Sequence, residues 1–342
     1  MLMPYGGYAN DSRLIIRGRA LREREATQAK PHTSAWRNFV ALVRLLNSAE
    51  VPGAEVCAQF RSREYKAVTD REGYFAFNID LDRRLERDIE VDLRLVTPRS
   101  ADGGPVIARA SICVPPISAR FGVISDIDDT IVWTYVGNRR RMLWTLARSN
   151  AATRKPLTGV AALYRALHDG VAGDEGNPIF YVSSGPWNLH PPLIDFLRIN
   201  AVPRGPVFMR DWGRHTFYQW RDHRTHKLAS IREIMTAFAR LPFVLIGDSG
   251  EQDPEIYREV VREFPGRVPA IYIRSVSAGP TRCAEVGRIA DEVRAAGSSL
   301  LLMTDSETAA IHEGRAGRIN PDRVQQVRLD EEVEKRLPVP AV

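Results

Sequence analysis

The sequence predicts an α/β protein with a doubly wound parallel sheet, preceded by a smaller β-sandwich-like domain. Two patterns along the chain predict this fold. Over residues 1–117, short segments of alternating apolar and polar residues follow one another, as in antiparallel β domains. Over residues 118–317, short apolar runs alternate with helical patterns, which is typical of parallel sheets. With 342 residues and 44% hydrophobic content, the chain can bury two cores.

The first domain, residues 1–117, consists mainly of predicted strands. They are expected at Leu14–Ala20, Val56–Phe60, Tyr74–Phe77, Glu90–Val96 and Val106–Val114, with one helix at Trp36–Leu46. The turn around Glu72-Gly73 and its flanking strands resemble transthyretin-like or carboxypeptidase-regulatory-like sandwich modules. Val114-Pro115-Pro116 is expected to be a linker, because consecutive prolines interrupt both helix and sheet.

The second domain, residues 118–317, alternates between the two kinds of element. Strands are expected at Gly122–Ser125, Pro178–Ser183, Val207–Met209, Phe243–Ile246, Ala270–Ile273 and Ser299–Met303. Helices are expected between them at Gly159–Leu167, His190–Leu197, His226–Ala239 and Pro254–Glu263. Residues 318–342 are expected to form a charged tail.

Composition restricts the partners and the compartment. The formal charge of +6 is compatible with anionic partners, but an ordinary basic protein has the same charge. Without a recurring basic and aromatic motif, nucleic acid is not expected. The three cysteines are odd in number and far apart, which indicates a reducing compartment rather than a disulfide framework. The chain shows neither a signal peptide nor a run of ~20 apolar residues. We therefore expect a cytoplasmic protein with no transmembrane segment, at most peripheral at a membrane surface.

Carboxylates follow the first strand of the second domain. The apolar run before Ser125 leads directly into Asp126-Ile127-Asp128-Asp129-Thr130. Open parallel sheets bind their ligands at the carboxyl ends of strands, where these acids are expected. Alternation puts Asp126 and Asp128 on the same side, as suits a bound cation or a nucleophile with an acid/base partner. Taken alone, a surface turn rich in aspartate explains the motif equally well.

Three further signals lie downstream. Ser183 and Ser184 end a strand before a helix-starting turn, where a serine could hold a phosphate or cap a helix. Ser183 is preferred because it follows the apolar run directly. Lys227 opens a helix, where a solvated lysine is the commoner arrangement. Asp248 and Asp253 follow another strand and suit an oxygen-liganded cation such as Mg²⁺, with a helix cap as the alternative.

The order of these signals resembles the four-motif signature of the haloacid dehalogenase superfamily. In particular, VISDIDDTI, FYVSSGPWNL, GPVFMRDWG and LIGDSGEQDPEIY resemble the catalytic domain of the actin-patch-associated type of Mg²⁺-dependent phosphatidate phosphatase and its bacterial homologues. PYGGYANDSRLIIRGRAL, IYIR and AAIHEGRAGRI also resemble that family. The resemblance implies a haloacid dehalogenase-like Rossmannoid phosphatase domain over 118–317, with a small cap insert at about 133–177.

The resemblance also implies a mechanism through an aspartyl-phosphate intermediate. Asp126 would be the nucleophile, Asp128 the general acid and base, and Thr130 a residue that steadies the loop. Ser183 and Lys227 would neutralise the transferring phosphoryl oxygens. Mg²⁺ would be held by Asp126, the Asp128 backbone carbonyl and Asp248, with Asp253 helping directly or through water. Asp129 receives no catalytic role.

The implied substrate is phosphatidate, an anionic phospholipid that would be converted to diacylglycerol plus phosphate. Arg139-Arg140-Arg141 and Trp144 in the insert are a candidate contact with an anionic membrane surface. An exposed helix face with a buried Trp144 is the competing interpretation. Two other functions stay open, a phosphatase of a soluble phosphomonoester or phosphoprotein and a non-catalytic phosphatidate-binding sensor. Lipid-transfer relatives that act as sensors lack the second aspartate, which this chain has as Asp128.

Overall fold

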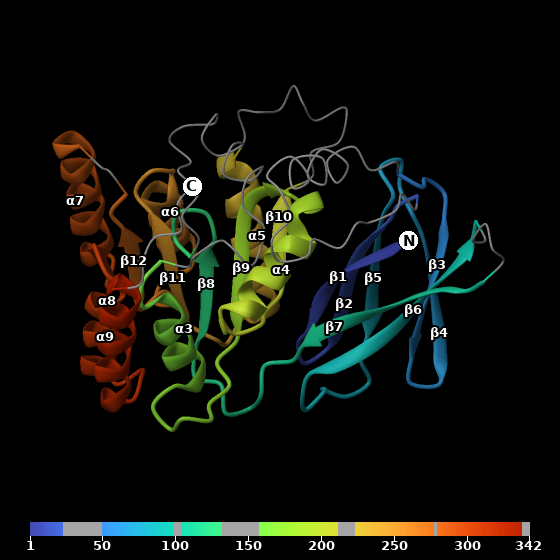
Figure 1. Cartoon of the computed structure of the whole chain (residues 1–342), viewed down its shortest axis with the longest axis horizontal. Coiled ribbons are helices and arrows are strands. Elements are labelled where there is room, and N and C mark those ends of the chain that lie inside the picture. Colours follow the sequence, from blue (N-terminus) through green and yellow to red (C-terminus); the bar gives the residue numbers. More distant parts are fainter. Residues whose placement is uncertain (23–49, 99–103, 132–156, 211–222, 277–278, 337–342) are drawn as a thin grey trace. The chain divides into compact units, whose positions relative to one another are not determined.

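The computed structural model describes residues 1–22, 50–98, 104–131, 157–210, 223–276 and 279–336 (Figure 1). The described residues divide into two compact units between Ile117 and Ser118. The helix expected at 36–46, most of the expected cap insert, and Arg139, Arg140, Arg141 and Trp144 lie outside the described residues. No helix in the described ranges has the length and apolar character needed to cross a bilayer.

The N-terminal unit forms one mixed sheet from its described strands, in the order β4-β3-β6-β7-β1-β2-β5. The strands are β1 Leu2–Ala9, β2 Arg13–Ala20, β3 Glu55–Phe60, β4 Arg63–Val68, β5 Tyr74–Asp80, β6 Ile89–Thr97 and β7 Val106–Cys113. Neighbouring strands are antiparallel except β1 and β7, which run parallel. The edge strands β4 and β5 also contact each other, so the sheet is nearly closed and barrel-like.

This single sheet differs from the two-layered sandwich that the sequence predicts. Alternation along a strand shows which residues are buried, and Phe75, Phe77 and Ile79 on β5 are indeed buried while Ala76 and Asn78 are exposed. Alternation does not show which strands pair, and a barrel and a sandwich bury the same alternate residues. Strand β1 has no counterpart in the prediction, because its Pro4 and paired glycines are unfavourable in strands.

The C-terminal unit contains a sheet of six parallel strands in the order β10-β9-β8-β11-β12-β13. They are β8 Gly122–Asp126, β9 Ile179–Pro186, β10 Val207–Arg210, β11 Phe243–Asp248, β12 Ala270–Arg274 and β13 Ser299–Met303. The chain moves outward from β8 to β10 and then returns to β11 on the other side of β8. The carboxyl ends of β8 and β11 therefore lie at the switch point of the sheet, where parallel α/β proteins bind ligands.

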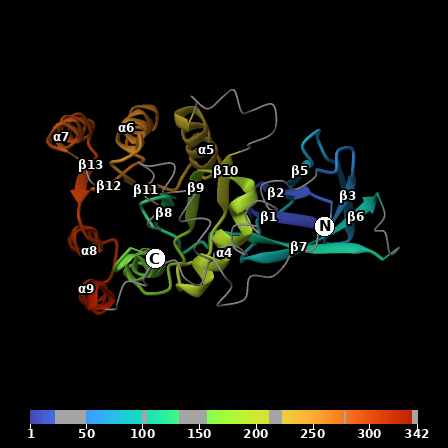
Figure 2. The same ribbon diagram turned by 45° about the horizontal axis from the view of Figure 1, so that its top comes forward.

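Helices cover both faces of this sheet (Figure 2). Helices α5 His223–Ala237, α6 Asp253–Glu263 and α7 Pro280–Ala295 lie along one face. The other face carries α3 Val160–Asp169, α4 His190–Ile199 with the preceding short helix η1 Trp187–Leu189, α8 Ser306–Arg315 and α9 Pro321–Arg336. With helices on both sides, the central strands β8 and β11 are buried along their whole length, as their continuous apolar runs predict.

Helix α9 replaces most of the charged tail expected at 318–342. It packs against α3 and α8 and buries Val327, which is fully shielded from solvent. Its charged residues find partners on α3, since Arg323 pairs with Asp169 and Arg165 pairs with Asp330. Because cross-helix ion pairs line much of its contact surface, α9 contains few apolar residues. It therefore lacks the hydrophobic periodicity by which a helix is recognised in a sequence.

Gly122 at the start of β8 offers a test of the packing between the central strands. A Cβ atom on Gly122 would stand 2.4 Å from the Phe243 ring at the start of β11. We expect Gly122→Ala to lower the free energy of unfolding by about 1–3 kcal/mol through overpacking. Gly287→Ala on α7 is the matched control, because nothing lies within 4 Å of the position that its new methyl group would take. Helix propensity should make that control neutral or stabilising. Urea unfolding of both variants measures the difference, and equal stabilities would contradict the prediction.

Candidate active site

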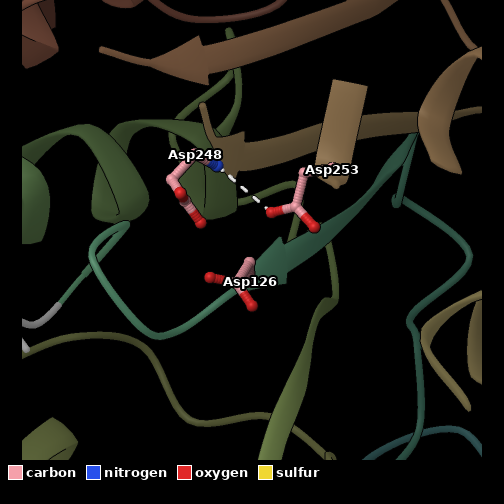
Figure 3. A group of neighbouring side chains, drawn as sticks. All are labelled: Asp126, Asp248 and Asp253. Carbon is pink, nitrogen blue, oxygen red and sulfur yellow. Dashed lines mark hydrogen bonds between the residues drawn. The ribbon is translucent and has the colours of Figure 1, made fainter. Parts of the chain in front are cut away.

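Three buried aspartates meet at the switch point of the parallel sheet (Figure 3). Asp126 is the last residue of β8, Asp248 is the last residue of β11, and Asp253 is the first residue of α6. One carboxylate oxygen from each lies within 4.8 Å of the others. The parallel pairing of β8 with β11 brings the two strand ends together, as the sequence predicts for Asp126 and Asp248.

The loop between β11 and α6 is shaped to bring Asp253 back to the strand end. Asp253 Oδ2 accepts a hydrogen bond from the backbone N–H of Asp248 at 3.1 Å. A Cβ atom on Gly247 would stand 2.3 Å from the same oxygen, so only glycine permits this approach. Asp248 Oδ1 in turn accepts from the backbone N–H groups of Gly250 and Glu251 at 2.6 and 2.9 Å. The loop therefore fixes both carboxylates.

Lys227, in the first turns of α5, is buried among carboxylates rather than solvated. Its side chain is 2% exposed, and its Nζ donates to Asp253 Oδ1 at 2.6 Å and to Glu251 Oε2 at 2.9 Å. The same Nζ lies 2.7 Å from Asp126 Oδ1 as an ion pair. Burial lowers the pKa of Lys227, but Asp126, Asp253 and Glu251 together raise it well above its usual range. The surrounding carboxylates therefore favour the charged form of Lys227.

Glu251 is a site residue that sequence reasoning missed. It lies between Asp248 and Asp253 in the loop, and its position alone does not distinguish it from an exposed loop acid. Its contact with Lys227 depends on α5, which precedes β11 in the chain, so the contact cannot be read from local sequence. The available signal was its place inside an acidic loop that already carried two candidate ligands.

The remaining candidates lie around the end of β8. Thr130 Oγ1 donates to Asp126 Oδ2 at 3.2 Å, and Ser183 Oγ donates to Asp128 Oδ2 at 3.0 Å. Ser183 Oγ also accepts from the Gly185 backbone N–H. The Ser184 hydroxyl is buried and has no hydrogen-bond partner in the described part of the chain. The geometry therefore joins Ser183, not Ser184, to the aspartates.

Asp129 has a backbone role that the sequence did not suggest. Its φ angle is +52°, in the left-handed region, which aspartate tolerates better than most residues. The turn closes with a 2.9 Å hydrogen bond from the Ile131 N–H to the Ile127 carbonyl. A residue that accepts this conformation is required for the chain to turn after Asp128.

The site concentrates negative charge in a place with little water. Burial, with smaller contributions from neighbouring carboxylates, raises the pKa of Asp126 and of Asp253 above the usual range. Burial and the Asp253 charge raise the pKa of Asp248 to about 8. Burial and the Glu251 charge raise the pKa of Asp128 to about 6, against the lowering effect of the Ser183 hydrogen bond. One lysine does not neutralise this group of acids.

The aspartates fit a hard cation such as Mg²⁺. Within the described residues, Asp248 Oδ2 is buried and accepts no hydrogen bond. Asp126 Oδ1 is also buried without a hydrogen bond, because Lys227 lies close to it but outside hydrogen-bond geometry. Oxygen atoms of this kind are the preferred ligands of Mg²⁺. Asp253 differs, since its two oxygens already accept from Asp248 and Lys227. Asp126 and Asp248 could thus hold the ion directly, with Asp253 beside it.

Residues 121–275 match the family model of the phosphatidate phosphatase APP1 catalytic domain. Every candidate residue of the site falls inside this segment. The C-terminal unit is therefore similar to the catalytic domain of a phosphatidate phosphatase. It carries no information about residues 1–120.

Individual relatives show the same similarity. Phosphatidate phosphatase APP1 of Saccharomyces cerevisiae is 34% identical over 157 residues, which are 46% of this chain and 26% of that protein. An uncharacterized protein of Schizosaccharomyces pombe is 27% identical over 216 residues, 62% of this chain and 35% of that protein. The chain therefore spans well under two thirds of the length of either relative. A carbohydrate acetylesterase from Xanthomonas citri covers 84% of this chain and 72% of its own at 14% identity, and its TM-score of 0.27 is too low to carry an argument.

Replacing Lys227 tests the charge balance of the site. In the presence of a chelator, we expect Lys227→Met to lower the free energy of unfolding by about 3–5 kcal/mol, because buried carboxylates lose their counter-ion. Lys66→Met is the matched control, since Lys66 pairs with Glu55 at the exposed surface, where losing an ion pair should change stability little. Denaturant unfolding measures both changes. A Lys227 variant as stable as the control would show that the carboxylates do not depend on the lysine charge.

Proposed function

We propose that this chain is a Mg²⁺-dependent phosphatase of the haloacid dehalogenase type, which hydrolyses phosphatidate to diacylglycerol and phosphate through an aspartyl-phosphate. The observation that carries the proposal is the buried cluster of Asp126, Lys227 and Asp248 inside the segment that matches the APP1 catalytic domain. The substrate rests on the family match, and the chemistry rests on the cluster.

Asp126 is the proposed nucleophile. Its carboxylate stands at the carboxyl end of β8, where Thr130 holds one oxygen and the Lys227 charge lies beside the other. A bond from a carboxylate oxygen to phosphorus forms as the bond from phosphorus to the lipid oxygen breaks. Burial raises the pKa of Asp126 well above its usual range, and the nearby Lys227 ammonium offsets only part of this effect.

Asp128 is the proposed general acid and base. A carboxyl group with a pKa of about 6 can hold a proton near neutral pH and also release it. It would give this proton to the departing lipid oxygen and then take one from the water that hydrolyses the aspartyl-phosphate. The Ser183 hydroxyl orients the Asp128 carboxyl through its 3.0 Å hydrogen bond.

Positive charge and hydrogen-bond donors are needed where phosphoryl charge develops. Lys227 and Ser183 are the proposed protein groups for that task, since fixed donors in a buried site stabilise developing charge strongly. Asp126, Asp248 and the Asp128 backbone carbonyl would hold Mg²⁺, with Asp253 beside them. When bound, the ion would supply further positive charge to the phosphoryl oxygens.

If phosphatidate is the substrate, the enzyme works at an anionic lipid surface, and we propose a cytoplasmic location for it. The candidate membrane contact, Arg139-Arg140-Arg141 with Trp144, lies outside the described residues, so the structure adds no argument for it. The lipid substrate is therefore proposed on the similarity to the APP1 catalytic domain alone.

Phosphate release from a substrate panel tests the proposal. We expect Mg²⁺-dependent release from phosphatidate in vesicles, and a loss of at least about 10³-fold in Asp126→Asn and Asp128→Asn, because each removes a group that the chemistry needs. Asp195→Asn is the control, since Asp195 is an exposed residue of α4 that pairs with Arg198. Full activity in either active-site variant would exclude this mechanism.

The same panel separates the possible substrates. Phosphatidate in vesicles is compared with a small aryl phosphate and a phosphopeptide at equal phosphate concentration. Faster turnover of the soluble esters would replace the lipid with a soluble substrate. Binding of phosphatidate without any turnover would indicate a sensor.

Metal binding can be tested without turnover. At a Mg²⁺ concentration of about 100 times its dissociation constant, we expect about 2.7 kcal/mol of stabilisation of the wild-type protein. Asp248→Asn removes the carboxylate charge at an oxygen that accepts no hydrogen bond among the described residues, so this stabilisation should largely vanish. Thermal unfolding with Mg²⁺ and with chelator measures it, with Asp195→Asn again as the control. An Asp248→Asn variant that gains as much as the wild type would place the ion elsewhere.

A further inference from the structure

Arg274, the last residue of β12, is buried without an acidic partner. The residue is 5% exposed, its Nη2 donates to Ser306 Oγ at 3.1 Å, and its buried Nε donates no hydrogen bond. Among the residues that the structure describes, no carboxylate forms an ion pair with this guanidinium. Taking an unpaired charge out of water is costly, so a buried charge normally has a partner. Arg274 therefore has donors available for an anion.

The acidic groups in its neighbourhood have other partners. Burial lowers the pKa of Arg274, and smaller effects of neighbouring groups, Glu331 and Asp305 among them, oppose it only in part. Glu331 Oε1 pairs with Lys335 Nζ at 2.9 Å, and the Asp305 side chain caps the N-terminus of α8. Neither acid binds the guanidinium directly.

The N-termini of α3 and α8 meet at Arg274. Ser306, the first residue of α8, accepts from Arg274 and donates through the same oxygen to the Thr158 carbonyl at 2.8 Å, directly before α3. Gly159, the N-cap of α3, permits this approach, because a Cβ atom on it would stand 3.1 Å from Ser306 Cβ. It also leaves α3 without a side-chain cap. The first N–H groups of a helix have no partner within it and give its N-terminus a partial positive charge.

Carboxylate oxygens of α9 already bind at these two helix starts. Glu334 Oε2 accepts from the Gly159 backbone N–H at 2.7 Å, and Glu331 Oε2 accepts from the Glu307 backbone N–H at 3.3 Å. The two helix starts therefore attract anionic oxygens, as helix N-termini do in general. The Arg274 guanidinium adds a full positive charge to the same place.

Arg274 and the catalytic lysine belong to opposite faces of the sheet. Helices α3 and α8 cover one face, whereas α5, which carries Lys227, covers the other (Figure 2). The two places are connected only through the backbone of the sheet edge. Arg274 pairs with Asp248 across β11 and β12, and its carbonyl accepts from the Ser249 backbone N–H at 2.9 Å. An anion bound at Arg274 would therefore be separate from the phosphoryl-binding groups but next to the loop after Asp248.

We infer that Arg274 and the N-termini of α3 and α8 form a second anion site, which binds a small inorganic oxyanion such as phosphate. A guanidinium offers its N–H donors in a planar fork that matches the oxygens of phosphate. Because Arg274 is 5% exposed, a free ion fits this place better than the headgroup of a lipid held in a membrane. The site goes beyond the proposed function and does not depend on it.

Calorimetric titration of the full chain with inorganic phosphate, in the presence of a chelator, tests the inference without turnover. We expect saturable binding to the wild type and at least about tenfold weaker binding to Arg274→Met, because charge-assisted hydrogen bonds are lost. Arg294→Met is the matched control, since Arg294 is an exposed residue of α7 that pairs with Asp291. Ser183→Ala removes a proposed phosphoryl donor from the catalytic site and should also leave this binding unchanged.

Thermal unfolding without phosphate provides a second measurement. Arg274→Met should be at least as stable as the wild type, because it removes a buried charge that has no partner. A variant that is much less stable or fails to fold would show that the free protein needs this guanidinium, and would overturn the inference. Phosphate binding that is absent from the wild type, unchanged in Arg274→Met or lost in Ser183→Ala would overturn it as well. Phosphatidate vesicles should not displace the free ion, and displacement would assign the site to a lipid headgroup instead.

Discussion

The site depends on the contacts between the buried ammonium of Lys227 and the carboxylates around it. It contacts carboxylates from three separate places in the C-terminal unit, at the end of β8, in the loop after β11 and at the start of α6. Removing a carboxylate from water costs several kcal/mol unless it gains a partner of opposite charge. The strand order of the sheet and the placement of α5 and α6 bring Lys227 next to these carboxylates. The site exists because the fold brings these segments together.

Two backbone features allow the acids to approach so closely. Gly247 leaves space that any side chain would take from Asp253, and Asp129 accepts the left-handed turn that follows Asp128. Both features belong to the carboxyl ends of β8 and β11 and the loops that follow, while the two strands themselves are buried along their whole length. Rigid strands therefore set the positions of the loops, and the loops set the chemistry.

Sequence reasoning located the strand-end residues but not their contacts. Asp126, Ser183 and Asp248 could be predicted, because each follows an apolar run at a place where parallel strands end. The burial of Lys227 and its contact with Glu251 could not be predicted, because both depend on segments brought together only by the fold. The pairing of the N-terminal strands could not be predicted either, because alternation shows which face of a strand is buried but not which strands are its neighbours. Helix α9 was not predicted, because its many charged residues leave no clear hydrophobic periodicity in the sequence.

Charge balance connects cation binding with substrate binding under the proposed function. Asp126, Asp248, Asp253 and Glu251 face one Lys227, so a phosphate dianion that arrives alone adds repulsion to an already negative cluster. A divalent cation bound first would offset two of these negative charges and so weaken the repulsion. The two ligands therefore favour each other's binding through electrostatics alone, with no change in the sheet that holds them.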